Sequence, residues 1–121
     1  MLHKRASALF FAMNYRTTKM DGRYSKHGYE YLVEFVKSSR TGTGVLEFDR
    51  ARRWFNATFG WSQDVETRDT MLRNKESHPD SYEPDDINPV WAYCVKYGDY
   101  RIYVDNDKTL SWFMLCHPKS Q

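Results

Sequence analysis

The sequence predicts an α+β fold in which an antiparallel sheet packs against one main helix. Two observations predict it: the last third is rich in β-branched and aromatic runs separated by short turns, and residues 48–59 carry an apolar stripe at helical spacing. With 121 residues, we expect a single domain spanning residues 1–121. Hydrophobic residues make up 40% of the chain and aromatic residues 17%, which excludes a disordered protein.

The N-terminal part predicts one short helix and one strand. The apolar residues of 3–15 recur at helical spacing, although residues 9–13 alone also fit a strand. A polar, turn-like segment follows. In residues 29–36 aromatic and aliphatic residues then alternate with glutamates, which is the period of a strand. We expect this further strand to join the C-terminal sheet.

The main helix is predicted over residues 48–59, and Gly60 ends it. Ser62 is expected to cap a second, weaker helix that runs through Leu72. Residues 75–89 contain three prolines and are expected to form a long loop. The apolar stripe of the main helix consists of Phe48, Ala51, Phe55 and Phe59.

Residues 90–97, 100–104 and 109–116 predict a three-stranded antiparallel β-meander. If Gly98-Asp99 forms a two-residue turn, Val95 pairs with Ile102. Alternation then divides the side chains between two faces, and the more apolar face is expected to be covered by the stripe of the main helix. That face would hold Trp91, Tyr93, Val95, Tyr97, Tyr100, Ile102, Val104, Phe113 and Leu115.

The opposite face of the predicted meander is mixed in character. Aromatic rings and cations together are the ingredients of a base-stacking platform, so this face is a candidate for binding nucleic acid or a partner. The alternative is that other elements partly cover it and that its arginine stacks on its tryptophan. The candidate residues are Lys96, Arg101, Tyr103 and Trp112.

The main helix also carries a cluster of arginines beside a tryptophan: Arg50, Arg52, Arg53 and Trp54. Arginine and tryptophan are enriched at interface hot spots, which makes this cluster the first candidate for partner binding. Trp54 falls off the phenylalanine stripe and is expected to be only half covered. The alternative is an ordinary solvated helix face.

Charge is distributed unevenly along the chain. The formal net charge is +2, but residues 1–40 carry +5 and residues 76–121 carry −4. The acidic part includes a cluster without a lysine or arginine, which is either a solvated loop or a contact for a basic partner. Its candidate residues are Asp80, Glu83, Asp85 and Asp86.

Catalytic and metal-binding signatures are lacking in the sequence. It contains no glycine-rich phosphate loop, no GxSxG and no HExxH, and we expect neither an enzyme nor a bound cofactor or metal. Cys94 and Cys116 lack metal-ligand spacing and are expected to be buried free thiols. No apolar run is long enough to cross a bilayer, so we expect no membrane contact and a cytoplasmic location, the host cytoplasm for a viral protein.

Together these features favour a small non-catalytic binding protein that occludes a functional surface of a protein partner. Small accessory and inhibitory proteins, including those of phages and other mobile elements, usually have this profile, so we rank an accessory or inhibitory factor first. The alternative is a nucleic-acid-binding module that uses the basic N-terminal third and the arginine helix. A third reading is an oligomeric structural subunit in which residues 29–36 supply a sheet edge for pairing.

Overall fold

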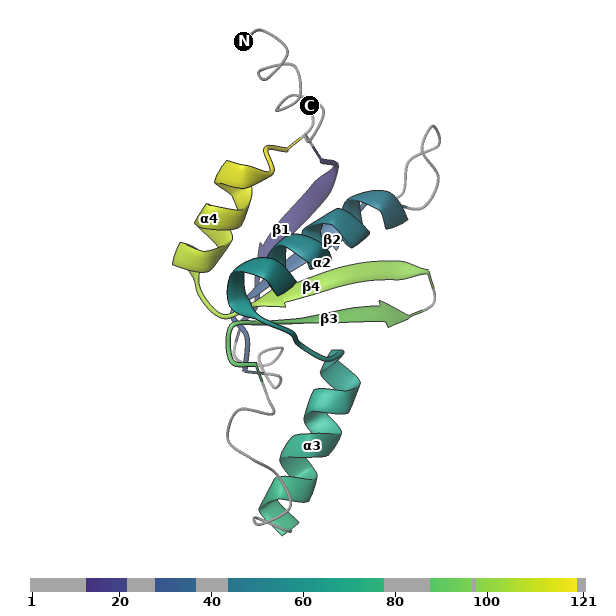
Figure 1. Ribbon diagram of the computed structural model, residues 1–121, viewed down its shortest axis with the longest axis vertical. Helices are drawn as coiled ribbons and strands as arrows, with labels where there is room; N and C mark the ends of the chain where they lie inside the picture. The colour runs from purple at the N-terminus through teal and green to yellow at the C-terminus, as the bar shows by residue number, and fades with distance from the viewer. Residues whose placement is uncertain (1–12, 22–27, 37–43, 78–87, 97, 120–121) are drawn as a thin grey trace, which may run out of the picture.

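The computed structural model describes residues 13–21, 28–36, 44–77, 88–96 and 98–119. These residues form a four-stranded antiparallel sheet and three helices, which confirms the α+β prediction (Figure 1). The strands are β1 (Tyr15–Lys19), β2 (Tyr31–Phe35), β3 (Trp91–Lys96) and β4 (Asp99–Val104). The helices are α2 (Val45–Phe59), α3 (Val65–Ser77) and α4 (Asp107–Cys116).

The sheet has the strand order β1-β2-β4-β3. The predicted strand over residues 29–36 is present as β2, but it lies in the interior and is hydrogen-bonded to β1 on one side and β4 on the other. It therefore offers no edge for pairing, and the edge expected from residues 29–36 is wrong. The two edges of this sheet are β1 and β3.

The hairpin of β3 and β4 is confirmed with a different register. Val95 pairs with Tyr100 and Lys96 with Asp99, whereas we expected Val95 to pair with Ile102. A shift of two residues leaves every side chain on the same face, because the side-chain period of a strand is two. Trp91, Ile102 and Val104 consequently lie in the core as predicted.

The third strand of the predicted meander is wrong, because residues 107–116 form helix α4. Asn106 caps this helix, and its side chain accepts a hydrogen bond from the Thr109 backbone N–H at 2.9 Å. Leu110 and Phe113 are buried one turn apart on the inner side of the helix. Leu115, which a strand would have turned inward, is 82% exposed.

The helix expected over residues 3–15 is not found in residues 13–15, the part of this range that the structure describes. Met13 forms an isolated bridge with Lys119, and Tyr15 begins strand β1; residues 1–12 lie outside the described residues. The Tyr15 hydroxyl donates a hydrogen bond to the His117 carbonyl at 2.6 Å, and burial raises the pKa of Tyr15 to about 12. This contact joins β1 to the end of α4.

Helix α2 lies across one face of the sheet and buries the predicted stripe against it (Figure 1). It begins at Val45, three residues before the predicted start, and Gly60 follows its last residue as expected. Phe55 is fully buried and stacks on Trp91 of β3 and on Phe113 of α4, with ring centroids 5.4 Å and 5.2 Å away. The main core therefore joins α2, α4 and the sheet.

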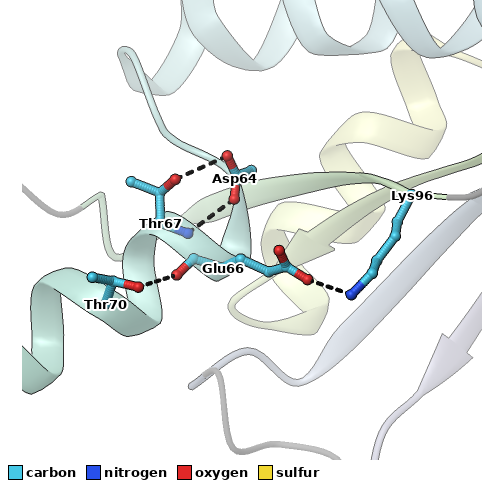
Figure 2. A network of polar contacts seen from close by, with 5 residues as sticks. All are labelled: Asp64, Glu66, Thr67, Thr70 and Lys96. Atoms are coloured by element: carbon cyan, nitrogen blue, oxygen red, sulfur yellow. Dashed lines mark hydrogen bonds and ion pairs between the residues drawn. The ribbon is translucent and has the colours of Figure 1, made fainter.

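Helix α3 begins at Val65 and extends away from the sheet (Figure 1). Its cap is Asp64, whose side chain accepts the Thr67 backbone N–H at 2.9 Å, as Figure 2 shows. The expected cap, Ser62, is instead buried and donates to the Trp91 carbonyl at 2.6 Å. The helix continues to Ser77, so residues 75–77 do not belong to the expected loop, and residues 78–87 lie outside the described residues.

A second, smaller core lies on the other face of the sheet. There the first turn of α3 packs against the sheet, and the Arg68 guanidinium lies over the Tyr29 ring at 4.7 Å from its centroid. The buried residues of this cluster are Tyr29, Val65, Ala92 and Tyr103. None of the helices in the described part of the chain is long and apolar enough to cross a membrane.

The stacked position of Phe55 predicts a large loss of stability on truncation. Phe55→Ala leaves a cavity between three elements and should lower the free energy of unfolding by about 3–5 kcal/mol in a urea titration. Leu115→Ala is the matched control, since a residue that is 82% exposed should change stability by no more than about 0.5 kcal/mol. A loss below about 1 kcal/mol for Phe55→Ala would contradict the packing of α2 described above.

His117 predicts a pH-dependent term in stability. It is buried against Phe113 and Trp54, and burial lowers its pKa below the ordinary value of 6.5, against a smaller opposing effect of the Phe113 carbonyl. The unfolded chain therefore binds the proton first, and this term destabilises the protein progressively as the pH falls below about 6.5.

The measurement is the difference in unfolding free energy between the parent chain and His117→Gln, taken from pH 8 to pH 5. Other titrating groups contribute to both proteins and largely cancel in the difference. The parent should lose stability relative to the variant only on the acid side. A difference that stays constant across this range would show that His117 has no lowered pKa.

Candidate functional site

Helix α2 divides the arginine and tryptophan cluster between its two sides. Arg52 and Arg53 line a shallow pocket next to β3, whereas Trp54 packs on the side of α4. Arg50 is exposed on α2 and does not line this pocket. The four residues chosen from the sequence therefore do not form one surface.

The pocket has a volume of about 170 Å³ and is formed by α2, the residues that follow it and β3. Its lining residues are Arg52, Arg53, Asn56, Trp61, Ser62, Trp91 and Tyr93. Two guanidinium groups and an amide thus meet three aromatic rings. This combination can bind a planar or apolar group together with a hydrogen-bond acceptor of negative charge.

The two arginines of the pocket differ in their surroundings. The Arg52 guanidinium lies over the Tyr93 ring, 5.0 Å from its centroid, and no carboxylate of the described residues lies within 4 Å of it. Arg53 forms an ion pair with Asp49 at 2.9 Å, but its side chain is 79% exposed. A pair this exposed contributes little to stability and can open when a ligand competes for the arginine.

Trp61 is the residue of the pocket that sequence reasoning missed. Its side chain is 69% exposed, although the backbone around it is held firmly. The Asn88 side-chain amide lies within 3.3 Å of the carbonyls of Phe59, Gly60 and Trp61, and the Trp91 indole donates to the Gly60 carbonyl at 2.9 Å. The only sequence signal was a tryptophan directly after a helix-ending glycine.

Trp54 belongs to the protein core more than to a binding surface. Its ring contacts Phe55, Phe59, Trp112, Phe113 and His117, with centroid separations between 5.0 and 5.7 Å. Its side chain is half-buried, as expected, and α4 packs over the buried part. Its part in partner binding stays a prediction, but its ring also packs against the core.

The mixed face predicted from the sequence is only partly assembled. Arg101 and Tyr103 lie on the second face of the sheet, and Lys96 lies at its β3 edge, but Trp112 is on α4 and contacts Trp54 and Phe59. A stack of Arg101 on Trp112 is excluded, since α4 packs against the opposite face. The predicted face is incomplete because the residues expected to form its third strand form helix α4 instead.

Two cations of this second face, Arg101 and Lys96, have carboxylate partners. Arg101 lies 3.5 Å from Glu34 and 3.5 Å from Asp99, and Lys96 forms an ion pair with Glu66 at 2.7 Å (Figure 2). Tyr103 is buried, and burial raises the pKa of its hydroxyl. Lys96 and Arg101, the two cations chosen from the sequence, thus already have carboxylate partners.

A wider hollow of about 470 Å³ lies between α3 and the second face, lined in part by Glu66, Asp69, Arg73 and Cys94. Burial, with Glu66 nearby, raises the pKa of the Cys94 thiol, which keeps it protonated and unreactive near neutral pH. Cys116 is exposed at the end of α4, contrary to expectation, whereas Cys94 is half-buried. Within the described ranges, no group of three or more His, Cys, Asp or Glu side chains could hold a metal ion.

The acidic contact candidates Asp80, Glu83, Asp85 and Asp86 lie outside the described residues. Comparisons with protein-family models, with curated proteins and with solved structures find no match to this chain.

The different settings of Trp54 and Arg53 predict opposite results from two neighbouring substitutions. Trp54→Ala removes a ring that α4 packs against and should cost about 2–4 kcal/mol of unfolding free energy. Arg53→Ala removes an exposed ion pair and should cost at most about 0.5 kcal/mol. Thermal or urea unfolding of both variants distinguishes these effects, and equal small losses would mean that Trp54 does not support α4.

Proposed function

We propose that this chain is a non-catalytic binding protein that covers a functional surface of a protein partner with its helix side. The helix side is defined here as α2, α4 and residues 60–62. The observation that carries the proposal is the exposed Trp61 beside Arg52 and Arg53 in one pocket. Tryptophan and arginine in a shared pocket are typical of binding hot spots, where a few residues supply most of the affinity.

The exposed apolar side chains of the helix side support this proposal. Trp61 is 69% exposed, Trp112 is 49% exposed and Leu115 is 82% exposed. Large apolar side chains at this exposure become favourable contacts when a partner excludes water from them. A stable interface of ordinary size buries about 800 Å² on each partner, which is enough to cover a surface or site on that partner.

The electrostatics favour a protein over a nucleic acid as the partner. Binding along a phosphate backbone needs several cations in a row, each of which neutralises a phosphate. On the second face, Arg101 and Lys96 are paired with carboxylates. At the pocket, Asp49 pairs with Arg53, which leaves Arg52 as the arginine of the pocket without an ion pair to a described carboxylate. The nucleic-acid alternative therefore ranks second.

An affinity pulldown with and without nuclease tests the class of partner. We expect a protein to be captured in similar amounts under both conditions, and we expect the purified protein to bind the purified chain in a defined stoichiometry. Capture that is lost on nuclease treatment would contradict the proposal and favour the alternative. Binding of the chain should also lower the activity of the partner, as occlusion requires.

Hydroxyl-radical footprinting of the purified complex tests which side binds. Trp61, Trp112 and Leu115 are exposed, and their oxidation should fall several-fold in the complex if the helix side is covered. Met20 and Leu32, which pack in the second core, serve as internal controls and should keep their reactivity. Protection of the controls with unchanged oxidation of the helix side would place the interface on the other face.

A further inference from the structure

The pocket beside α2 has an unbalanced set of hydrogen-bonding groups. Arginine side chains are donors only. The Ser62 hydroxyl and the Trp91 indole already donate to the Trp91 and Gly60 carbonyls, at 2.6 Å and 2.9 Å. The remaining polar groups are the guanidinium groups of Arg52 and Arg53, the Asn56 amide and the Tyr93 hydroxyl, and donors predominate among them. A ligand that supplies acceptors and a negative charge therefore fits this pocket best.

Trp61 adds an apolar contact surface for a ligand next to the two arginines. Its indole is exposed, while the carbonyls of residues 59–61 are all held by Asn88 or Trp91. An aromatic anchor on a fixed backbone loses little conformational entropy when a ligand covers it. The pocket is thus prepared for a ligand that carries an apolar or aromatic group close to its negative charge.

The surroundings of the pocket limit the negative charge of the ligand to a small number. Asp49 lies against Arg53, and the adjoining hollow, which shares Tyr93 with the pocket, is lined by Asp64 and by the ion pair of Glu66 with Lys96. A chain of phosphates that extends from the pocket would meet the carboxylates of Asp49 and Asp64, and the cation in the hollow, Lys96, is already neutralised by Glu66. A single carboxylate on a mostly uncharged segment would reach Arg52 without that penalty.

We propose that this pocket anchors an acidic residue of a protein partner, with its carboxylate on Arg52 and Arg53 and an adjacent apolar or aromatic side chain on Trp61. This inference rests on the proposed function, since it names the chemistry of the partner segment that the helix side receives. Arg52 is the principal contact, because Tyr93 positions its guanidinium and no described carboxylate occupies it. Arg53 contributes after its exposed pair with Asp49 opens.

The experiment selects ligands from a displayed library of random 12-residue peptides on the full chain at physiological salt. The selected peptides should be enriched in Asp or Glu next to Trp, Phe or Leu. Their dissociation constants should rise at least tenfold for Arg52→Gln and for Trp61→Ala. Arg73→Gln is the matched control, because Arg73 is an exposed arginine on α3 and its loss should leave affinity unchanged within twofold. Thermal unfolding verifies that all three variants are folded.

The inference is overturned if no peptide is enriched, if enrichment lacks an acidic residue, or if Arg52→Gln binds within twofold of the parent. It is also overturned if a twelve-nucleotide single strand of DNA binds the pocket more tightly than the peptides do at the same salt. Binding of the captured partner to the same variants distinguishes the proposed function from the pocket inference. If that partner binds all variants equally, the pocket inference fails and the binding function stands; if the peptides behave as expected and no protein is captured, the binding function fails alone.

Discussion

The aromatic stack centred on Phe55 is the interaction on which the rest of the structure depends. Its ring lies between Trp91 of β3 and Phe113 of α4, so one side chain of α2 joins both neighbouring elements. Stacked rings of this kind combine a large buried apolar area with a preferred geometry, which fixes position as well as contributing stability. Helix α4 is held by this stack, by Trp54 and by Tyr15 of β1, whose ring lies 5.3 Å from Phe113 and whose hydroxyl donates to the His117 carbonyl.

Trp91 extends the effect of this stack to the candidate site. While its ring packs on Phe55, its indole N–H binds the Gly60 carbonyl and its own carbonyl accepts the Ser62 hydroxyl. Asn88, three residues earlier, binds the carbonyls on either side of Gly60. The segment that carries Trp61 is thereby attached to the core, and an exposed tryptophan is held in one place without being buried itself.

The helices and strands with a strong local sequence pattern could be predicted. Those that depend on contacts with distant parts of the chain could not. Residues 48–59 and 29–36 have clear apolar periods and form α2 and β2 as expected. In β1 only Tyr15 is buried, so this edge strand lacks an alternating pattern. Residues 109–116 have the composition of a strand, yet the Asn106 cap and the burial of Leu110 and Phe113 one turn apart favour a helix.

For the candidate site, the sequence analysis chose Arg52, Arg53 and Trp54, whereas the pocket brings Arg52 and Arg53 together with Trp61. Trp54 and Trp61 both lie off the phenylalanine stripe, and periodicity within α2 contains no information about α4, which covers Trp54. The backbone that carries Trp61 is held by hydrogen bonds from Asn88 and Trp91, about thirty residues further along the chain. Such long-range contacts leave no local pattern that a single sequence could show.

The two faces of the sheet differ in how their charges are satisfied, and this difference bears on function. On the second face, Arg101 and Lys96 form ion pairs with carboxylates of the chain, so a ligand of these two residues would have to displace those carboxylates. On the helix side, Arg52 is held by an aromatic ring that supports its orientation while leaving its N–H groups available. An arginine positioned in this way loses little conformational freedom when it binds an external carboxylate, which supports the proposed binding role of the helix side.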